Sequence, residues 1–320
     1  MIAPSKKCLG RRRWLLGLCM LAGAGGAAAI SYSLAGADSP ADPELAARYA
    51  AMVSYDSAPE NSTQQADGRH AIPGVASLES AVRWAEASLV DVRKIHDYTC
   101  TLIKRERVGD RLLAPQYMTV KVRQQPYSVY VRYLAPQALR NQEAIYVDGR
   151  NGGKLLAHST GMRHRLVGTV ALKPTSPLAM RGNRHPITEI GLAILVEKLA
   201  VLGRHDLSHG SLAETTFHRG VLLNGRPCTE IEVRHPQKKP GLEYHIAKIF
   251  VDEKFVLPVR FEAYDWPDSP GEQPPLLEEY MYVDLRLNNG FTDADFDAGN
   301  PQYGFARGTA PEIRTTAQAQ

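Results

Sequence analysis

The densest group of residues able to do chemistry lies in the range 181–189. Pro186 fits the start of a helix because its fixed φ matches the helical value, and Glu189 can accept hydrogen bonds from the free amides of a first turn. Cations beside a helix start can bind an anion such as a lipid phosphate or a carboxylate. The polar candidates for such a site are Arg181, Asn183, Arg184 and His185. The alternative is a structured loop in which Arg184 pairs with Glu189 or with other acids nearby.

Histidines and acids elsewhere are poorly spaced for a metal. His205 and His209 are four residues apart, but glycines on both sides predict a loop, and zinc needs three or four ligands. Acids alternate over 293–297 as in a calcium loop, yet the glycine and the glutamate of that motif are missing. We therefore predict no metal and no cofactor, and we interpret 293–297 as a closing turn anchored by Phe291 and Phe296.

The sequence contains no recognisable catalytic apparatus. Glu230 and Glu232 lie on one side of a predicted strand, as the paired carboxylates of a glycosidase must, but this pattern is common on solvent-facing strands. A Gly-x-Ser-x-Gly elbow and a phosphate-binding glycine loop are both missing. We therefore expect a protein that is not an enzyme.

Two cysteines lie beyond the first 37 residues, Cys100 and Cys228. In an oxidising compartment they could form a disulfide, and closing so long a loop could stabilise the fold by roughly 4–5 kcal/mol. The strand phase is unfavourable, because Cys100 alternates with apolar residues such as Leu102 whereas Cys228 alternates with Glu230 and Glu232, which we expect to face solvent. Pairing and free thiols both remain open at this point.

Two helices are needed to position these residues. The first is predicted over 77–96, where apolar residues recur at steps of three and four and Ser77 can cap the start. The second is predicted over 187–202, ending at Gly203, and is apolar nearly all round. Such a helix must be buried or dock on an apolar surface, so we place it as a lid over a curved sheet. Its apolar candidates for ligand binding are Ile190, Ile194, Leu195 and Leu199.

Most of the remaining chain alternates apolar and polar residues as antiparallel strands do. Strands do not alternate regularly with helices, which argues against a parallel sheet. The predicted fold class is α+β and mainly β: one strongly curved antiparallel sheet of roughly ten strands, with an N-terminal helix and an inserted apolar lid helix. The strand-like runs are 98–108, 112–123, 127–134, 143–147, 154–158, 164–170, 213–223, 227–234, 243–251, 256–264 and 277–287.

Residues 1–37 are typical of an export signal, with a basic start, an uncharged apolar stretch and a small-residue cleavage pattern. A cleaved signal peptide and a retained membrane anchor both fit. Arg11 and Arg12 have the character of a twin-arginine signal, so export by the Sec or the Tat route is open. We expect an extracytoplasmic, periplasmic protein whose membrane contact is transient or made through this segment.

Charge outside that segment is nearly balanced. The chain has 38 Lys and Arg and 34 Asp and Glu, and residues 1–37 contain five basic and no acidic residues, which leaves 33 against 34. This balance argues against nucleic acid as a partner. Residues 38–75 are predicted to be a flexible spacer with a short helix at 42–53, residues 76–305 a single β domain, and residues 306–320 a disordered tail.

Five stretches of the chain resemble DUF1571, a bacterial family of unknown function: 98–107, 121–130, 144–149, 182–191 and 291–297. The order of helices and strands also resembles the half-barrel of the LolA-like superfamily of periplasmic lipoprotein carriers. The resemblance implies a curved sheet whose apolar concave face is closed by helices and can shield acyl chains. It supplies no catalytic residues, because the closer family has no assigned activity.

Two functions follow as hypotheses. The first is a carrier or binding protein of the cell envelope for a lipid, a lipoprotein or another apolar ligand. The second is a structural or protein-interaction module of the same fold with a filled core and an envelope protein as partner. A continuous apolar cavity of several hundred Å³ beneath residues 187–202 would favour the first, and a packed interior would count against it.

Overall fold

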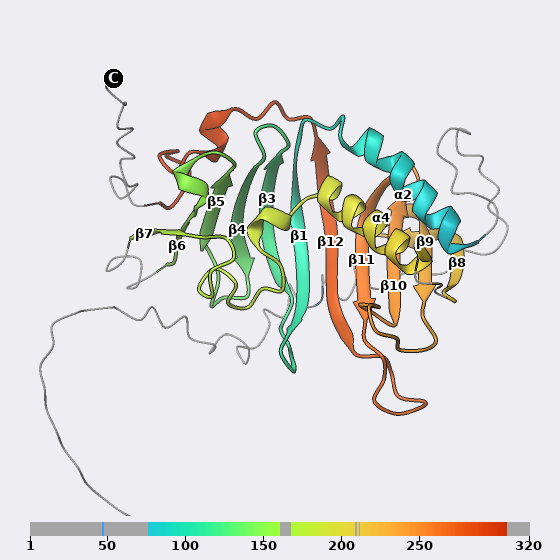
Figure 1. Cartoon of the computed structure of the whole chain (residues 1–320). Helices are drawn as coiled ribbons and strands as arrows, with labels where there is room; N and C mark the ends of the chain where they lie inside the picture. Colours follow the sequence, from blue (N-terminus) through green and yellow to red (C-terminus); the bar gives the residue numbers. More distant parts are fainter. Residues whose placement is uncertain (1–46, 48–75, 161–167, 209, 211, 306–320) are drawn as a thin grey trace, which may run out of the picture. The chain divides into compact units, whose positions relative to one another are not determined.

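The computed structural model describes residues 76–160, 168–208, 210 and 212–305, together with Ala47 (Figure 1). The predicted export signal, the spacer with its short helix, the tail and His209 lie outside the described residues. Among the described residues, no helix is both long enough and apolar enough to cross a membrane.

The described chain forms one curved antiparallel sheet with two helices on one of its faces (Figure 1). The predicted fold class is therefore confirmed, with twelve strands in place of roughly ten. The predicted strand over 112–123 is divided in two. Of the predicted strand over 164–170, residues 164–167 lie outside the described residues, and β7 covers 169–172. The strands are β1 (Asp97–Val108), β2 (Arg111–Leu112), β3 (Gln116–Arg123), β4 (Ser128–Ala135), β5 (Glu143–Val147), β6 (Leu155–His158), β7 (Thr169–Leu172), β8 (Glu214–Leu223), β9 (Arg226–Arg234), β10 (Ile246–Asp252), β11 (Leu257–Tyr264) and β12 (Leu276–Leu287).

The strand order explains why one face of the sheet is covered. The order is β7-β6-β5-β4-β3-β1-β12-β11-β10-β9-β8, with β2 beside β1, so consecutive strands β7 and β8 lie at opposite edges. The connection between them must cross the sheet, and it does so over the face that also carries the first helix (Figure 1). The crossing segment includes η3 (Ile187–Glu189) and α4 (Leu192–Ser208), and the first helix is α2 (Leu78–Val92).

Alternation along the strands sorts side chains onto two faces. On β1, Leu102 packs in the cluster beneath α2 and α4, and we call this side the helix face. Its neighbour Ile103 packs on the other side with Phe250 and Met281, which we call the opposite face. Over β4–β6 the opposite face is covered by the segment 291–305, which contains η4 (Asp293–Phe296). A further short 3-10 helix, η2 (Asn151–Gly153), lies between β5 and β6.

The first helix begins where the sequence predicted. Ser77 has extended backbone angles, and its Oγ accepts a hydrogen bond from the Ser80 amide at 3.2 Å. This cap satisfies one of the free donors of the first helical turn. The helix ends at Val92, four residues before the predicted end at His96.

The predicted bounds of the second helix are wrong at both ends. The helix starts at Leu192 and runs through Gly203 to Ser208. Gly203 lies where α2 and α4 cross, since a Cβ placed there would lie 2.4 Å from Cγ2 of Val82. This glycine therefore permits close helix packing and does not end the helix. The prediction of a loop around His205 is also wrong, because His205 lies within this helix.

The hypothesis of a disulfide is also wrong, because Cys100 and Cys228 are free, buried thiols. Three strands separate β1 from β9 in the sheet, which corresponds to roughly 19 Å at the spacing of neighbouring strands. A disulfide needs Cα atoms within about 7 Å. The two thiols also belong to clusters on different faces of the sheet.

Candidate functional site

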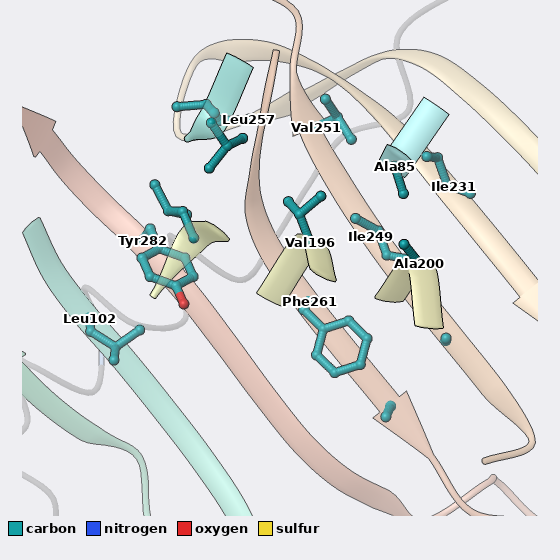
Figure 2. Close-up of a cluster of buried hydrophobic side chains, with 14 of the residues drawn as sticks. Ala85, Leu102, Val196, Ala200, Ile231, Ile249, Val251, Leu257, Phe261 and Tyr282 are labelled. Atoms are coloured by element: carbon teal, nitrogen blue, oxygen red, sulfur yellow. The ribbon is translucent and has the colours of Figure 1, made fainter. Parts of the chain in front are cut away.

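The site is the interface between the helix face and the α2–α4 pair. Val196 and Ala200 of α4 lie above Ile249 and Phe261 of the sheet (Figure 2). The residues of α4 that are almost completely buried recur at four-residue steps: Leu192, Val196 and Ala200. A stripe with this spacing marks the buried side of a helix, so the sequence contained the signal that these three residues face the sheet.

The four apolar candidates from the sequence occupy the margins of that stripe. Ile190, Ile194, Leu195 and Leu199 are all partly buried. Ile190, Leu195 and Leu199 pack against the main core, whereas Ile194 approaches Gly191 at the start of the helix. Leu199 alone among the four lines the cavity described below.

Two tyrosine hydroxyls hold the start of α4 against the sheet. The Leu192 amide donates to the Tyr98 hydroxyl at 2.9 Å, and the Tyr127 hydroxyl donates to the Ile190 carbonyl at 2.6 Å. Burial raises the pKa of both tyrosines well above the ordinary value. Both side chains are therefore neutral hydrogen-bonding groups at any physiological pH.

A small cavity of about 50 Å³ lies between α2, α4, β9 and β10. Ligand pockets are usually about 300–1,000 Å³. This cavity is therefore smaller than the several hundred Å³ that would favour a carrier, and the helices pack closely on the sheet around it. Asp206 is the single charged residue of the lining. The lining residues are Leu78, Ala81, Val82, Trp84, Ala85, Leu199, Gly203, Asp206, Ile231, Val233, Tyr244, Ala247 and Ile249.

Polar groups gather at one side of this cavity. Asp206 in the last turn of α4 has Oδ2 3.1 Å from Nε2 of His235, and both side chains are buried. Tyr244 also lines the cavity, and burial together with the Asp206 carboxylate raises its pKa. Nε1 of Trp84 is buried and has no hydrogen-bond acceptor among the described residues.

The polar candidates of the loop 181–185 lie together on the helix face, near the start of α4. Arg184 Nε lies 3.1 Å from Glu278, and its amide donates to Glu106 at 3.1 Å. His185 lies between two carboxylates, at 2.8 Å from Glu278 and 3.2 Å from Glu189. Each of these groups therefore already has a carboxylate partner.

Further contacts complete this polar cluster. The amide oxygen of Asn183 accepts from Lys104 Nζ at 2.5 Å, and Lys104 also pairs with Glu106 at 3.1 Å. Lys198 of α4 pairs with Glu189. Arg181 is exposed. The cluster thus contains three carboxylates and three permanent cations: Glu106, Glu189, Glu278, Lys104, Arg184 and Lys198. This arrangement corresponds to the alternative of a structured loop with internal ion pairs, although the partners of Arg184 are Glu278 and Glu106 in place of Glu189.

Electrostatics of the cluster depend on His185. The hydrogen bond with Glu278 is the largest cause that raises the pKa of His185. Burial alone would raise the pKa of Glu278, but the nearby His185 and Arg184 more than offset it and lower that pKa. Protonated His185 therefore strengthens the attachment of this loop to β12.

The remaining sequence candidates have structural contacts. Glu230 and Glu232 both pair with Lys248, at 2.9 and 3.1 Å, and Glu230 is only 4% exposed, so the expectation of a solvent-facing position is wrong. Residues 293–296 form the short 3-10 helix η4, and Phe291 packs edge to face on Phe296. Among the residues that the structure describes, no group of three His, Cys, Asp or Glu side chains could hold a metal ion.

The fold and this interface define a class of protein: an open antiparallel sheet with an α-helical pair packed on one apolar face. Residues 95–305 match the family model described as "Protein of unknown function (DUF1571)". The chain belongs to the DUF1571 family, and the predicted membership is confirmed. No curated protein matches the sequence.

Solved structures with a similar arrangement share little sequence with this chain. The lipoprotein LppX of Mycobacterium tuberculosis is 11% identical, with 68% of this chain and 98% of that chain covered and a TM-score of 0.39. A LolA superfamily protein from Nitrosomonas europaea is 13% identical, with 67% and 97% covered and a TM-score of 0.28. The MucA/MucB complex of Pseudomonas aeruginosa is 14% identical, with 68% and 61% covered and a TM-score of 0.39.

Proposed function

We propose that this protein is an exported, non-enzymatic binding protein for a lipid, an acylated molecule or another apolar ligand. The ligand would lie between the helix face and the α2–α4 pair. The observation that carries this proposal is the apolar character of that interface, since the residues around its small cavity are aliphatic or aromatic except for Asp206 and Gly203. Burial of apolar surface is the main favourable term available to a ligand in such surroundings.

Binding of a whole lipid requires α2 and α4 to move off the sheet, because the cavity of about 50 Å³ is too small. The two helices are suited to move as one body. They cross closely at Gly203 and are also joined by Arg93–Glu197 and Arg204–Glu86 ion pairs. The polar contacts of α4 with the sheet lie at its two ends, at Leu192 and Asp206.

The predicted export signal supports the location in which such a protein would act. With residues 1–37 as a cleaved signal or an anchor, the β domain would lie outside the cytoplasm. The ligand would then be a component of the cell envelope.

Co-purified ligand and direct binding together test the proposal. We expect organic extracts of the full chain, purified from the envelope fraction, to contain lipid by mass spectrometry. We also expect the extracted protein to bind a neutral naphthylamine dye. Ala247→Val places two methyl groups in the cavity, so it should weaken dye binding at least about fivefold, whereas Val201→Ala on the exposed side of α4 should leave it unchanged.

The packed interior specifically favours a second candidate, a protein-interaction module with a filled core. This module would bind a partner in the envelope through its surface and would contain no ligand. Extracts without lipid, together with failure to bind the dye, would reject the first function and leave the second. Deuterium exchange would distinguish them further, since addition of dye should increase exchange in α4 only if the helices move.

A further inference from the structure

The cavity beneath α2 and α4 exists because small residues meet there. Ala81 and Ala85 of α2, Gly203 of α4 and Ala247 of β10 all line it. The three alanines leave space that a larger side chain would fill in a close-packed interior, whereas the space beside Gly203 is taken up by Val82. The cavity is therefore a feature of the residue choice on α2 and β10.

Trp84 supplies an unused hydrogen-bond donor at this cavity. Its side chain belongs to the lining, the residue is 7% exposed, and Nε1 has no acceptor among the described residues. Buried polar groups are nearly always hydrogen-bonded, since leaving one unpaired is unfavourable. An indole N–H can only donate, so its missing partner must offer an oxygen or another acceptor.

Asp206 restricts the charge of that partner. Its carboxylate lines the same cavity, with His235 close to Oδ2 and the neutral Tyr244 also in the lining. A second carboxylate in these apolar surroundings would lose its hydration and would face a like charge. An ester or amide carbonyl, which accepts a hydrogen bond without carrying charge, meets neither obstacle.

We infer that this cavity takes the uncharged, carbonyl-bearing part of an apolar ligand, such as an ester- or amide-linked acyl chain, and discriminates against a free fatty acid. The inference rests on the proposed function and adds the chemical class of the ligand. Trp84 would donate to the carbonyl oxygen, and the aliphatic lining would contact the adjoining chain.

Matched probes test this discrimination in the full chain. Methyl decanoate and decanoate differ in the charge of the carbonyl end, and both are titrated by displacement of the naphthylamine dye at pH 8. We expect the ester to bind about tenfold more tightly than the acid. Trp84→Phe retains the ring but removes the donor, so ester binding should weaken about five- to tenfold while acid binding changes little. Val90→Ala, on the exposed side of α2, is the control.

A second measurement does not depend on the stability of the variant. The indole ¹⁵N–H resonance of Trp84 in the wild-type chain should shift on addition of the ester, as expected for a new hydrogen bond. Equal binding of ester and acid, or an ester complex in which this resonance is unmoved, would overturn the inference and leave the proposed function standing. If neither the dye nor the ester binds and the indole proton exchanges only with water, both the inference and the proposed function are rejected.

Discussion

The two faces of the sheet are covered by different kinds of contact. On the helix face, α2 and α4 pack mainly through aliphatic side chains, and a glycine sets how closely the helices cross. On the opposite face, the segment 291–305 is held by charged and aromatic contacts, including Arg123 with Asp293 at 2.9 Å and Lys121 with Asp295 at 3.0 Å. The packing of the helices therefore depends on side-chain volume, whereas the packing of the segment 291–305 depends on individual polar partners.

Lys121 illustrates the second kind of cover. Its ammonium group lies 5.1 Å from the ring centre of Phe291 and 5.5 Å from that of Tyr303, in addition to its ion pair. Cation–π contacts add to such an ion pair when they are partly shielded from water. A cover that fits mainly by shape has few polar contacts to break when it moves, and for α4 these lie at Leu192 and Asp206. The segment 291–305 would have to break several ion pairs. The difference supports movement of the helices more than movement of the segment 291–305.

The largest expected effect is at Glu143, the acceptor for several groups beneath the segment 291–305. Glu143 accepts from Tyr130 at 3.0 Å and from the Gly304 amide at 2.7 Å, and it lies 2.8 Å from His158. Glu143→Ala should lower the free energy of unfolding by about 3–5 kcal/mol, since it leaves buried polar groups unpaired. Urea unfolding measures this change.

The exposed ion pair of Glu86 with Arg204 provides the control for that prediction. Glu86→Ala should change stability by less than about 1 kcal/mol, because exposed pairs contribute little. Equal effects of the two substitutions would mean that the segment 291–305 is not held by its polar contacts.

The next effect concerns the volume at the helix crossing. Helix propensity alone predicts that Gly203→Ala stabilises an α-helix by about 1 kcal/mol. The close approach of Val82 predicts the reverse, and we expect a net destabilisation of about 1–3 kcal/mol in urea unfolding. Val82→Ala removes the methyl group that would clash, so the double variant should lose less stability than the sum of the single variants. Simple additivity would show that the crossing tolerates the extra methyl.

The smallest expected effect is the pH dependence of the polar cluster around His185. Because its pKa is raised in the folded state, the stabilisation by His185 is complete below about pH 6.5 and is lost as pH rises through the raised value. Glu278, Glu189, Glu106, Lys198 and Tyr280 are the charged or titratable groups that face it.

His185→Gln tests this pH dependence. We expect the difference in unfolding free energy between wild type and variant to shrink from pH 6 to pH 9, by less than about 1 kcal/mol because the side chain is partly exposed. A difference that is constant with pH would show that His185 is held neutral. The comparison is made at one ionic strength, since screening weakens such pairs.

Local patterns in the sequence predicted local structure well. Alternation predicted the strands of the sheet, and Ser77 predicted the start of α2 to the residue. Gly203 was interpreted as a helix end because glycine is common there, but its role depends on Val82, which is distant in sequence. Glu230 was expected at the surface because nothing local shows that Lys248 lies beside it.

For the candidate site too, the sequence predicted local features but not contacts between distant residues. The sequence identified an apolar helix after a polar loop, and both lie on the helix face. It did not identify the buried stripe of Leu192, Val196 and Ala200, although the four-residue spacing was visible. Contacts of the loop with Glu106 and Glu278 were not predictable, because they join residues 78 and 94 positions apart.

By itself, the sequence determined the elements and the balance of charge, since period-two and period-four patterns and formal charges are properties of neighbouring residues. Only the tertiary structure decided that β7 and β8 lie at opposite edges, and therefore that the segment between them crosses and covers one face. It also decided that Cys100 and Cys228 remain apart and that Trp84 and Asp206 meet at one cavity. These outcomes depend on strand order and helix crossing, which arise from packing among residues far apart in the chain.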